Sequence, residues 1–216
     1  MTKTFHNANI AYEYYHDKII RKGVKFGDTK ALFNVGFYLE NPMDNAIKNK
    51  ERKWNPVYAE AEWQWYLSGD RNTAKLKELY GKIPEIWKLM EDSQGNVNSN
   101  YGWQWKRNDQ IGCVINMLKE YPDTRQAAIS IYDCKEWDSY EYDTPCTYAV
   151  QFTILNNKLN MSVVMRSNDL WYGFCNDQYQ FSKLQHYIWN RLNIKDLEIG
   201  TYFHYAHNLH LYNNKI

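Results

Sequence analysis

Cys146 and Arg166 are the residues whose types and positions first indicate covalent chemistry. Cys146 follows residues 143–145 at the start of an expected strand, where a side chain is held rigidly yet remains open to a cleft. Arg166 ends the adjoining expected strand, and a guanidinium beside a thiol lowers the thiol pKa toward neutrality. The pair could therefore supply a nucleophile and an anion site. A single cysteine at a strand edge is otherwise most often a small apolar filler.

Three histidines near the end of the chain invite a metal interpretation, which the local pattern does not favour. His204, His207 and His210 recur at every third residue of an expected strand. Side chains three residues apart on a strand lie on opposite faces, so His207 should point away from the other two. We therefore predict no metal site.

Helices and one hairpin are expected in the first half of the chain. A polar segment, 41–55, contains the basic run 48–53, which we interpret as a solvated loop without a role. Proline at the first turn, glycine after the last turn and the apolar spacing predict helices over 5–20, 56–68, 73–80, 84–91 and 109–120, and a hairpin over 24–39 that turns at Gly27 and Asp28.

The second half is rich in strands. Alternating apolar residues predict strands over 127–132, 146–155, 159–166 and 201–212, and a helix over about 178–192. The fold class is therefore α+β, with a mostly antiparallel sheet that must hold Cys146 and Arg166 side by side.

Composition limits the class of protein. The chain has 216 residues and a net charge of +1, which fits one domain over 1–216 and gives no electrostatic reason to bind nucleic acid. It lacks an apolar run long enough to cross a membrane and an apolar leader at its start, so we expect a cytoplasmic protein. The four cysteines have no CxxC spacing and are expected to be thiols.

Several segments, taken in order, resemble the thymidylate synthase superfamily over about residues 21–212. Each is short, but their order along the chain matches that of the family. They are Glu62 to Asp70, Asn100-Tyr101-Gly102, Pro122-Asp123-Thr124-Arg125, Cys146-Thr147 with Gln151-Phe152, Arg166-Ser167-Asn168-Asp169, Gly173 to Asp177, and His210-Leu211-Tyr212.

The resemblance implies a fold of three layers, in which a large, mostly antiparallel or mixed sheet is flanked by helices. It also implies that Cys146 attacks C6 of a pyrimidine nucleotide, so that C5 becomes nucleophilic toward the one-carbon unit of 5,10-methylenetetrahydrofolate. Glu62 would order water and relay protons, with a pKa raised by neighbouring Trp63, Trp65 and Tyr66. Without the resemblance, Glu62 would be interpreted as a surface glutamate.

One position favours a branch of this superfamily. Deoxyuridylate enzymes have an asparagine where this sequence has Asp177. A carboxyl group accepts from the N4 amino group of cytosine and, when protonated, donates to N3. With Gly-Phe-Xaa-Asn-Asp at 173–177, Ser99 to Trp103 and Cys-Thr at 146–147, the sequence is similar to the phage deoxycytidylate hydroxymethylases. These add water where a synthase adds hydride, and the implied product is a modified nucleotide for phage DNA.

The resemblance also implies the remaining contacts. The 5'-phosphate would meet Arg21, Arg125, Arg166 and Ser167, with Asn168 close by, and the ribose 3'-hydroxyl would meet His210 and Tyr212; taken alone, the arginines would be surface ion-pairing residues and the last two a sheet pair. Folate would meet Trp87, Asp169 and Gly173. Arg125 would reach the site of the other subunit, which implies a homodimer. Gln126 replaces a second arginine of this arm, and Lys22 or Lys25 could compensate.

Alternatives remain open from the sequence. The chain ends four residues after Tyr212, so we expect a short lid and a less sealed cavity that suits water as the final nucleophile. The rival hypotheses are a deoxyuridylate methylase or hydroxymethylase, a cytidylate hydroxymethylase, and a noncatalytic nucleotide-binding homologue.

Overall fold

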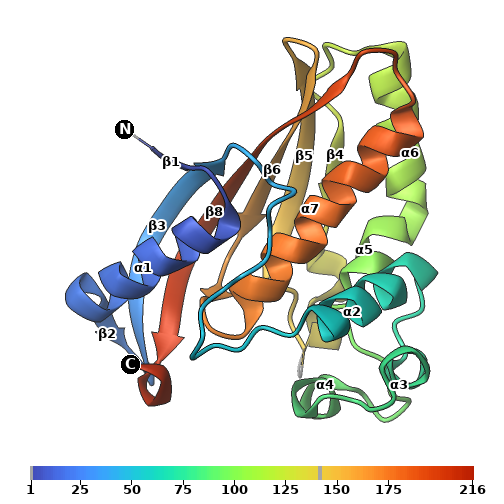
Figure 1. Cartoon of the computed structure of the whole chain (residues 1–216). Coiled ribbons are helices and arrows are strands. Elements are labelled where there is room, and N and C mark those ends of the chain that lie inside the picture. The colour runs from blue at the N-terminus through green and yellow to red at the C-terminus, as the bar shows by residue number, and fades with distance from the viewer. Residues whose placement is uncertain (1, 141–142) are drawn as a thin grey trace.

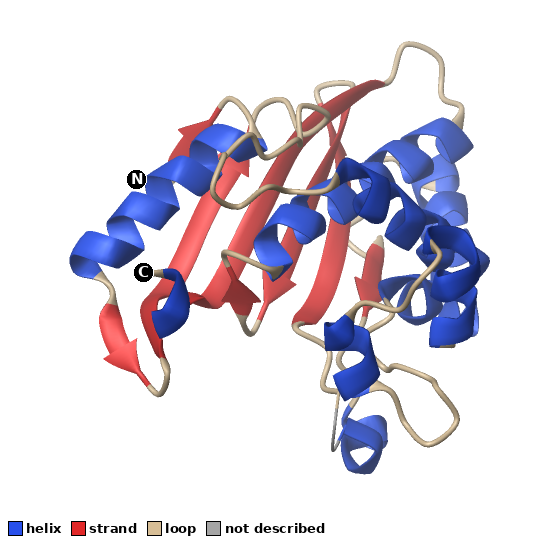
Figure 2. Ribbon diagram, turned by 60° about the horizontal axis from the view of Figure 1, so that its bottom comes forward, coloured by secondary structure: helices blue, strands red, loops and turns tan. Residues whose placement is uncertain are grey.

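The computed structural model describes residues 2–140 and 143–216. Its centre is a mixed sheet of eight strands in the order β1-β3-β8-β6-β5-β4, with β2 paired to β3 and β7 paired to β8 (Figures 1 and 2). The strands are β1 (Lys3–Phe5), β2 (Val24–Phe26), β3 (Thr29–Leu39), β4 (Ala128–Ser130), β5 (Thr147–Leu155), β6 (Lys158–Met165), β7 (Asn168–Asp169) and β8 (Glu198–Tyr212).

The sheet contains both parallel and antiparallel pairs. β3 runs antiparallel to β2 and β8, and β5 runs antiparallel to β4 and β6. β8 pairs parallel with β6 and β7, and β1 pairs parallel with β3. The expected α+β class is confirmed, and the sheet is mixed because the connection through the long helix returns β8 parallel to β6.

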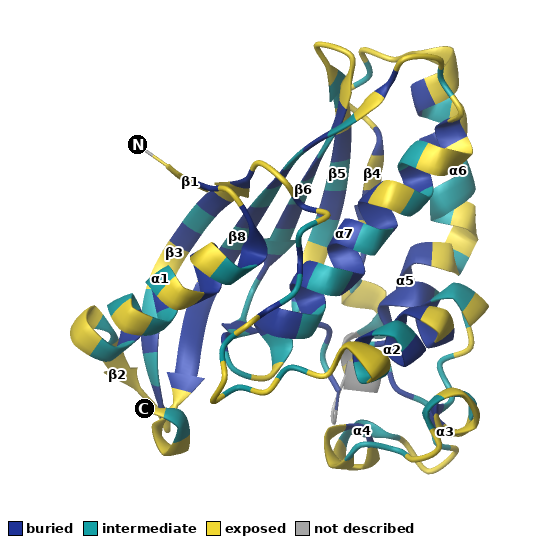
Figure 3. Cartoon of the chain, in the orientation of Figure 1, coloured by how far each residue is buried: buried dark blue, intermediate teal, exposed yellow. Residues whose placement is uncertain are grey.

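Helices cover the sheet from one face. They are α1 (Ala8–Lys22), α2 (Pro56–Ser68), α3 (Thr73–Tyr80), α4 (Glu85–Met90), α5 (Tyr101–Lys106), α6 (Gln110–Glu120) and α7 (Gly173–Leu192), with short 3-10 helices η1 (Arg107–Asp109), η2 (Cys134–Tyr140) and η3 (Asn213–Lys215). α1 and α7 pack on the strands, and α2 and α6 pack on α7 (Figure 1). The middle of α7 is correspondingly buried (Figure 3).

The ends of several elements show why these residues form them. Asn55 caps α2 by accepting from the backbone N–H groups of Val57 and Tyr58, and Gly69 ends it at φ 71°. A residue with a Cβ is strained at this left-handed conformation, so the proline start and glycine stop are confirmed.

Three expectations about element boundaries were wrong. α1 begins at Ala8, because Asn7 caps it by accepting from Ile10, and Phe5 instead belongs to β1. Helical structure begins before the expected start at 109, because Asn100 caps helix α5 by accepting from the backbone N–H of Trp103. α7 begins at Gly173 rather than near 178, which places Asp177 inside a helix.

The buried core is aromatic. Trp65, Tyr12, Phe37, Phe152 and Phe174 are fully buried side chains. Among the described residues, no helix is both long enough and apolar enough to cross a membrane.

Candidate active site

A cavity of about 970 Å³ opens where the ends of β6, β7 and β8 meet α2, α4 and the start of α7. Every residue that the sequence predicted as catalytic or binding lines it, except Arg21 and Arg125. The predicted residues in its wall are Glu62, Trp87, Cys146, Arg166, Ser167, Asn168, Asp169, Gly173, Asp177, His210 and Tyr212.

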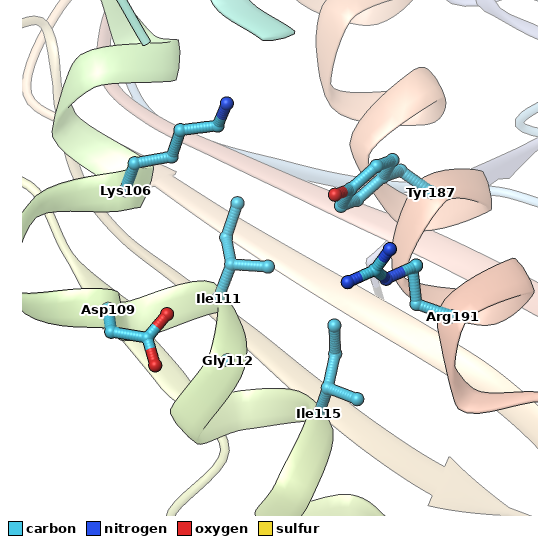
Figure 4. Close-up of a pocket in the computed structure, with 7 residues that line it drawn as sticks. All are labelled: Lys106, Asp109, Ile111, Gly112, Ile115, Tyr187 and Arg191. Atoms are coloured by element: carbon cyan, nitrogen blue, oxygen red, sulfur yellow. The ribbon is translucent and has the colours of Figure 1, made fainter. Parts of the chain in front are cut away.

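A second, smaller pocket of about 270 Å³ contains none of the predicted residues. It lies between the start of α6 and the end of α7, and its wall includes Lys106, Tyr187 and Arg191 (Figure 4). Its Lys106 ammonium already donates to the backbone carbonyl of Leu67. The candidate chemistry is therefore concentrated in the larger cavity.

Cys146 and Arg166 are neighbours across two paired strands, as the sequence predicted. The backbone N–H of Arg166 donates to the carbonyl of Cys146 at 2.8 Å. Arg166 also donates through Nε to Pro145 O at 3.0 Å and through Nη2 to Thr144 O at 2.8 Å, and Nη2 lies 3.8 Å from Cys146 Sγ. The guanidinium is thus fixed by main-chain acceptors beside the sulfur.

The thiol pKa departs from the expectation. Burial raises the pKa of Cys146 to about 11, and Arg166 opposes this shift without reversing it. The expectation of a near-neutral thiol was wrong, because desolvation of the sulfur and the nearby carboxyl groups outweigh one guanidinium. The free cysteine is therefore a protonated thiol at neutral pH.

Glu62 is a buried carboxyl group with two side-chain donors. Tyr58 O–H donates to Oε1 at 2.6 Å, and Gln180 Nε2 donates to Oε2 at 2.9 Å. Trp87 Nε1 donates in turn to the Tyr58 hydroxyl at 2.7 Å. Burial raises the Glu62 pKa to about 7, and the two donors lower it. Such a group exchanges protons readily near neutral pH.

Asp177 is a second buried carboxyl group in the same cavity, and its side chain is held from one side. Asn168 Nδ2 donates to Asp177 Oδ2 at 2.7 Å. Burial raises the Asp177 pKa to about 8, and the charge of Glu62 raises it further, while the Asn168 hydrogen bond lowers it. At neutral pH, Asp177 therefore offers both a donor and an acceptor to a ligand.

Asp169 and His210 face each other across β7 and β8, where they are register partners. His210 Nδ1 is 3.0 Å from Asn208 Oδ1, and burial lowers the His210 pKa. Asp169 accepts the backbone N–H of Trp171 at 2.8 Å, and burial raises its pKa. His207 is exposed, whereas His204 and His210 are buried, as the strand spacing predicted.

Arg21 and Arg125 do not line the cavity. Arg21 lies in the last turn of α1, where its Nε donates to Asp17 at 2.7 Å and its side chain is 73% exposed. Arg125 is exposed in the turn between α6 and β4. A single chain therefore leaves both arginines outside the pocket.

Sequence reasoning missed several side chains in or behind the cavity wall. Tyr58 precedes Glu62 by one helical turn, a spacing that could have revealed their contact. Gln180 and His204 carry no recognisable local signal, because their partners lie far away in the sequence. Arg52, in the basic run 48–53, also lines the cavity and donates through Nε to the backbone carbonyl of Trp171.

No cluster of three or more potential metal ligands occurs in the part of the chain that the structure describes. All four cysteines are free thiols, and Cys175 is buried.

Comparison with known proteins identifies similar sequences. A family model described as Thymidylate synthase matches residues 11–216. The Deoxycytidylate 5-hydroxymethyltransferase of Enterobacteria phage T4 is 35% identical over 189 residues, which cover 83% of this chain and 69% of the phage protein. The Thymidylate synthase of Buchnera aphidicola subsp. Acyrthosiphon pisum (strain Tuc7) is 33% identical over 218 residues, covering 92% and 79% of the two chains.

Proposed function

This chain belongs to the thymidylate synthase family and is a one-carbon transferase, and we propose that it transfers a hydroxymethyl group to C5 of deoxycytidylate. The choice of deoxycytidylate as substrate rests on Asp177, whose buried carboxyl group lies in the cavity wall and keeps its proton at neutral pH because its pKa is about 8. Cytosine presents an acceptor at N3 beside a donor at N4, and a protonated carboxyl group complements both.

Cys146 is the proposed nucleophile. Its thiol loses its proton as the S–C6 bond forms, which leaves C5 of the pyrimidine electron-rich. Arg166, 3.8 Å from Sγ, stabilises the developing thiolate, and its Nη1 remains for the 5'-phosphate after Nε and Nη2 bind main-chain carbonyls. Ser167 lies beside it in the cavity wall.

Glu62 is the proposed proton carrier. Because its pKa is about 7, it can accept a proton from water and return one to the base within one catalytic cycle. Tyr58 and Gln180 hold both carboxyl oxygens, which keeps the group oriented toward the cavity that it lines. His210 and Tyr212, at the end of β8, are proposed to bind the ribose 3'-hydroxyl.

The outer wall of the cavity fits a flat, largely apolar ring system. Trp87, the half-exposed Ile86 and the strongly exposed Leu89 contribute apolar surface to the cavity wall, which also includes Asp169 and Gly173. The family uses methylenetetrahydrofolate as co-substrate, and this compound supplies the one-carbon unit when bound. We propose that Trp87, Asp169 and Gly173 form its contact surface.

A homodimer is proposed to complete the phosphate end. Arg125 is exposed and does not line the cavity of its own chain, so it is available to a second copy. In the described parts of the chain, the sheet also has one face that no helix covers, on which Tyr38 and Tyr148 are exposed and Phe203 and Tyr205 are half-buried. Packing of two such faces would bury these rings and carry Arg125 across.

The proposed activity is tested by tritium release from [5-³H]deoxycytidylate, [5-³H]deoxyuridylate and [5-³H]cytidylate with methylenetetrahydrofolate, with product masses measured. We expect release from deoxycytidylate with a hydroxymethyl gain in mass. Release confined to deoxyuridylate would favour a synthase activity like that of the Buchnera relative.

Asp177→Asn provides the matched variant for this experiment. It should shift turnover from deoxycytidylate toward deoxyuridylate, since an amide can accept from N3–H and donate to O4 of uracil. An unchanged preference would contradict the role of Asp177, and a wild-type protein that binds nucleotide without exchanging tritium would be noncatalytic.

A further inference from the structure

Behind Asp177, a row of buried polar groups runs away from the cavity into the core. His204 on β8 lies 3.1 Å through Nε2 from Asn168 Oδ1, and Asn168 donates to Asp177. On its other side, His204 Nδ1 lies 2.8 Å from the Tyr202 hydroxyl and 3.1 Å from Gln178 Nε2. His204, Gln178 and Tyr202 are fully buried, and none of the three lines the cavity.

The partners of His204 assign its hydrogen. Two groups face Nδ1. The Gln178 amide nitrogen can only donate, and it donates to the Tyr202 hydroxyl as well as facing Nδ1. Because the Tyr202 oxygen accepts from Gln178, its own hydrogen can point toward Nδ1. At Nε2, the partner is the amide oxygen of Asn168, which only accepts. Both sides therefore place the hydrogen on Nε2. Burial lowers the pKa of His204 to about 3, so the ring is neutral at working pH.

This polarity determines which oxygen of Asp177 carries the proton. Asn168 Oδ1 is occupied by His204, so the Asn168 amide must turn its Nδ2 toward Asp177. Asp177 Oδ2 then acts as an acceptor, and the carboxyl hydrogen resides on Oδ1. A hydroxyl at Oδ1 meets N3 of cytosine, and the second lone pair of Oδ2 remains for the N4 amino group.

We propose that His204 is a positioning residue, which selects deoxycytidylate over deoxyuridylate by locking the Asn168 amide and thereby the proton position of Asp177. The inference rests on the proposed function and adds a residue outside the cavity to its specificity. The direction of the hydrogen bonds matters because exchanging every donor and acceptor along the row would change Asp177 from a donor to an acceptor at N3.

In the opposite arrangement of this hydrogen-bonded row, the side-chain amides of Gln178 and Asn168 are both rotated by half a turn, so that their oxygen and nitrogen atoms exchange places. Gln178 Oε1, which has no partner within the described residues, would then accept from Nδ1–H, and Asn168 would donate to Nε2. Asp177 would donate its hydrogen to Asn168 and present only an acceptor to N3. That arrangement matches the N3–H of uracil, so the polarity of the row distinguishes the two bases.

The aromatic surroundings hold the ring in place without setting this polarity. Phe37 on β3 stacks on His204 at 5.1 Å between centroids, and Phe174 on α7 meets it edge-on at 5.7 Å. Neither ring carries a hydrogen-bonding group. A phenylalanine at 204 would therefore preserve packing and remove only the polar link.

The test compares wild type with His204→Phe and His204→Gln. Dissociation constants for deoxycytidylate and deoxyuridylate are measured by calorimetry without folate, and long-range ¹⁵N–¹H spectra of the wild-type protein report the His204 tautomer. The His204→Gln spectrum identifies the His204 signals. We expect an Nε2–H tautomer, and a preference for deoxycytidylate that falls about tenfold or more in His204→Phe. His204→Gln keeps an amide N–H for Asn168 and should retain most of the preference.

Each outcome decides between the proposals. Equal loss of affinity for both nucleotides in His204→Phe would reduce His204 to a structural residue, and an Nδ1–H tautomer would overturn the inference even if that variant does not fold. Wild-type protein that prefers deoxyuridylate would remove the proposed function itself. Wild-type preference for deoxycytidylate with an unchanged ratio in His204→Phe would remove this inference alone.

Discussion

The proposed base end and the proposed phosphate end of the cavity differ in how completely one chain builds them. At the base end, Glu62 and Asp177 are buried, and each has side-chain hydrogen-bond partners supplied from the same chain. At the phosphate end, Arg166 is fixed in the wall, whereas Arg21 and Arg125 are exposed and outside it.

This difference suits two tasks: the base end must hold reacting groups in fixed positions, whereas the phosphate end needs only to attract and bind an anion. A base-reading site needs its donors and acceptors fixed before the substrate arrives, because reorientation of buried dipoles is costly. A dianionic phosphate is attracted over a distance, so its ligands can close in from flexible or neighbouring segments. We expect substitutions at the base end to change chemistry and specificity, and those at the phosphate end to change affinity.

The largest effect is expected at the nucleophile. Cys146→Ala should lower tritium release from deoxycytidylate by about 10⁴-fold or more, because no other thiol reaches the cavity wall. Nucleotide affinity should change little, since the hydrogen-bonding groups remain. Cys113→Ser, which changes an exposed thiol, is the matched control. Retained turnover in Cys146→Ala would end the assignment of the covalent step to the base end.

The next effect concerns the dependence of the phosphate end on a second copy. Arg125→Ala should lower kcat/KM for deoxycytidylate about a hundredfold, mostly through KM. Mixing this variant with Cys146→Ala by reversible unfolding should restore up to about a quarter of wild-type activity, because half of the dimers then hold one intact site.

Two results would contradict this arrangement. Absence of restored activity, when sedimentation shows mixed dimers, would mean that Arg125 serves its own chain. A monomer with full activity would show that the phosphate end is complete within one chain. Gln126→Ala, at the neighbouring exposed position, serves as the control substitution.

The contrast also shows what sequence alone could predict. Cys146 and Arg166 were placed together because their strands are adjacent in the chain, and a short hairpin through Asn156 and Asn157 fixes the pairing. The class of fold and most helices followed equally from local periodicity and end signals.

Long-range contacts escaped prediction for a physical reason. Gln180 reaches Glu62 across the fold, and nothing in the pattern of α7 marks that glutamine. His204 resembled a buried strand residue, since its importance depends on Asn168, which lies on another strand. The net thiol pKa was also missed, because desolvation is a property of the assembled cavity.

A third prediction uses pH to sharpen the account of the base end. The Asp177 pKa is raised from 3.8 to about 8, so between these values the folded protein retains a proton that the unfolded chain releases. The free energy of unfolding therefore falls as pH rises through this window. Asp177→Asn lacks this loss, so its stability relative to wild type should rise between pH 4 and pH 8, by up to about 5 kcal/mol for a shift of about four pKa units.

Urea denaturation at several pH values measures this difference. Asp123→Asn, at an exposed position, should show no such trend. If the stability difference between Asp177→Asn and wild type stays constant from pH 4 to 8, Asp177 is ionised over this whole range. An ionised Asp177 has no proton to donate to N3 of cytosine, which would contradict the proposed recognition of the base.

The smallest effect is expected at Arg21, the most weakly held part of the phosphate end. Its side chain is mostly exposed and pairs with Asp17 one helical turn earlier, so binding phosphate must exchange one anionic partner for another. Arg21→Ala should raise KM for deoxycytidylate about threefold to tenfold and leave kcat nearly unchanged. Asp17→Ala should lower KM slightly, because it frees the guanidinium. Lys195→Ala, which removes an exposed cation outside the cavity, is the matched control, and steady-state kinetics at low and high salt separate local contact from general attraction. A hundredfold loss in kcat for Arg21→Ala would contradict the comparison, since it would place this flexible helix end within the preorganised machinery of the base end.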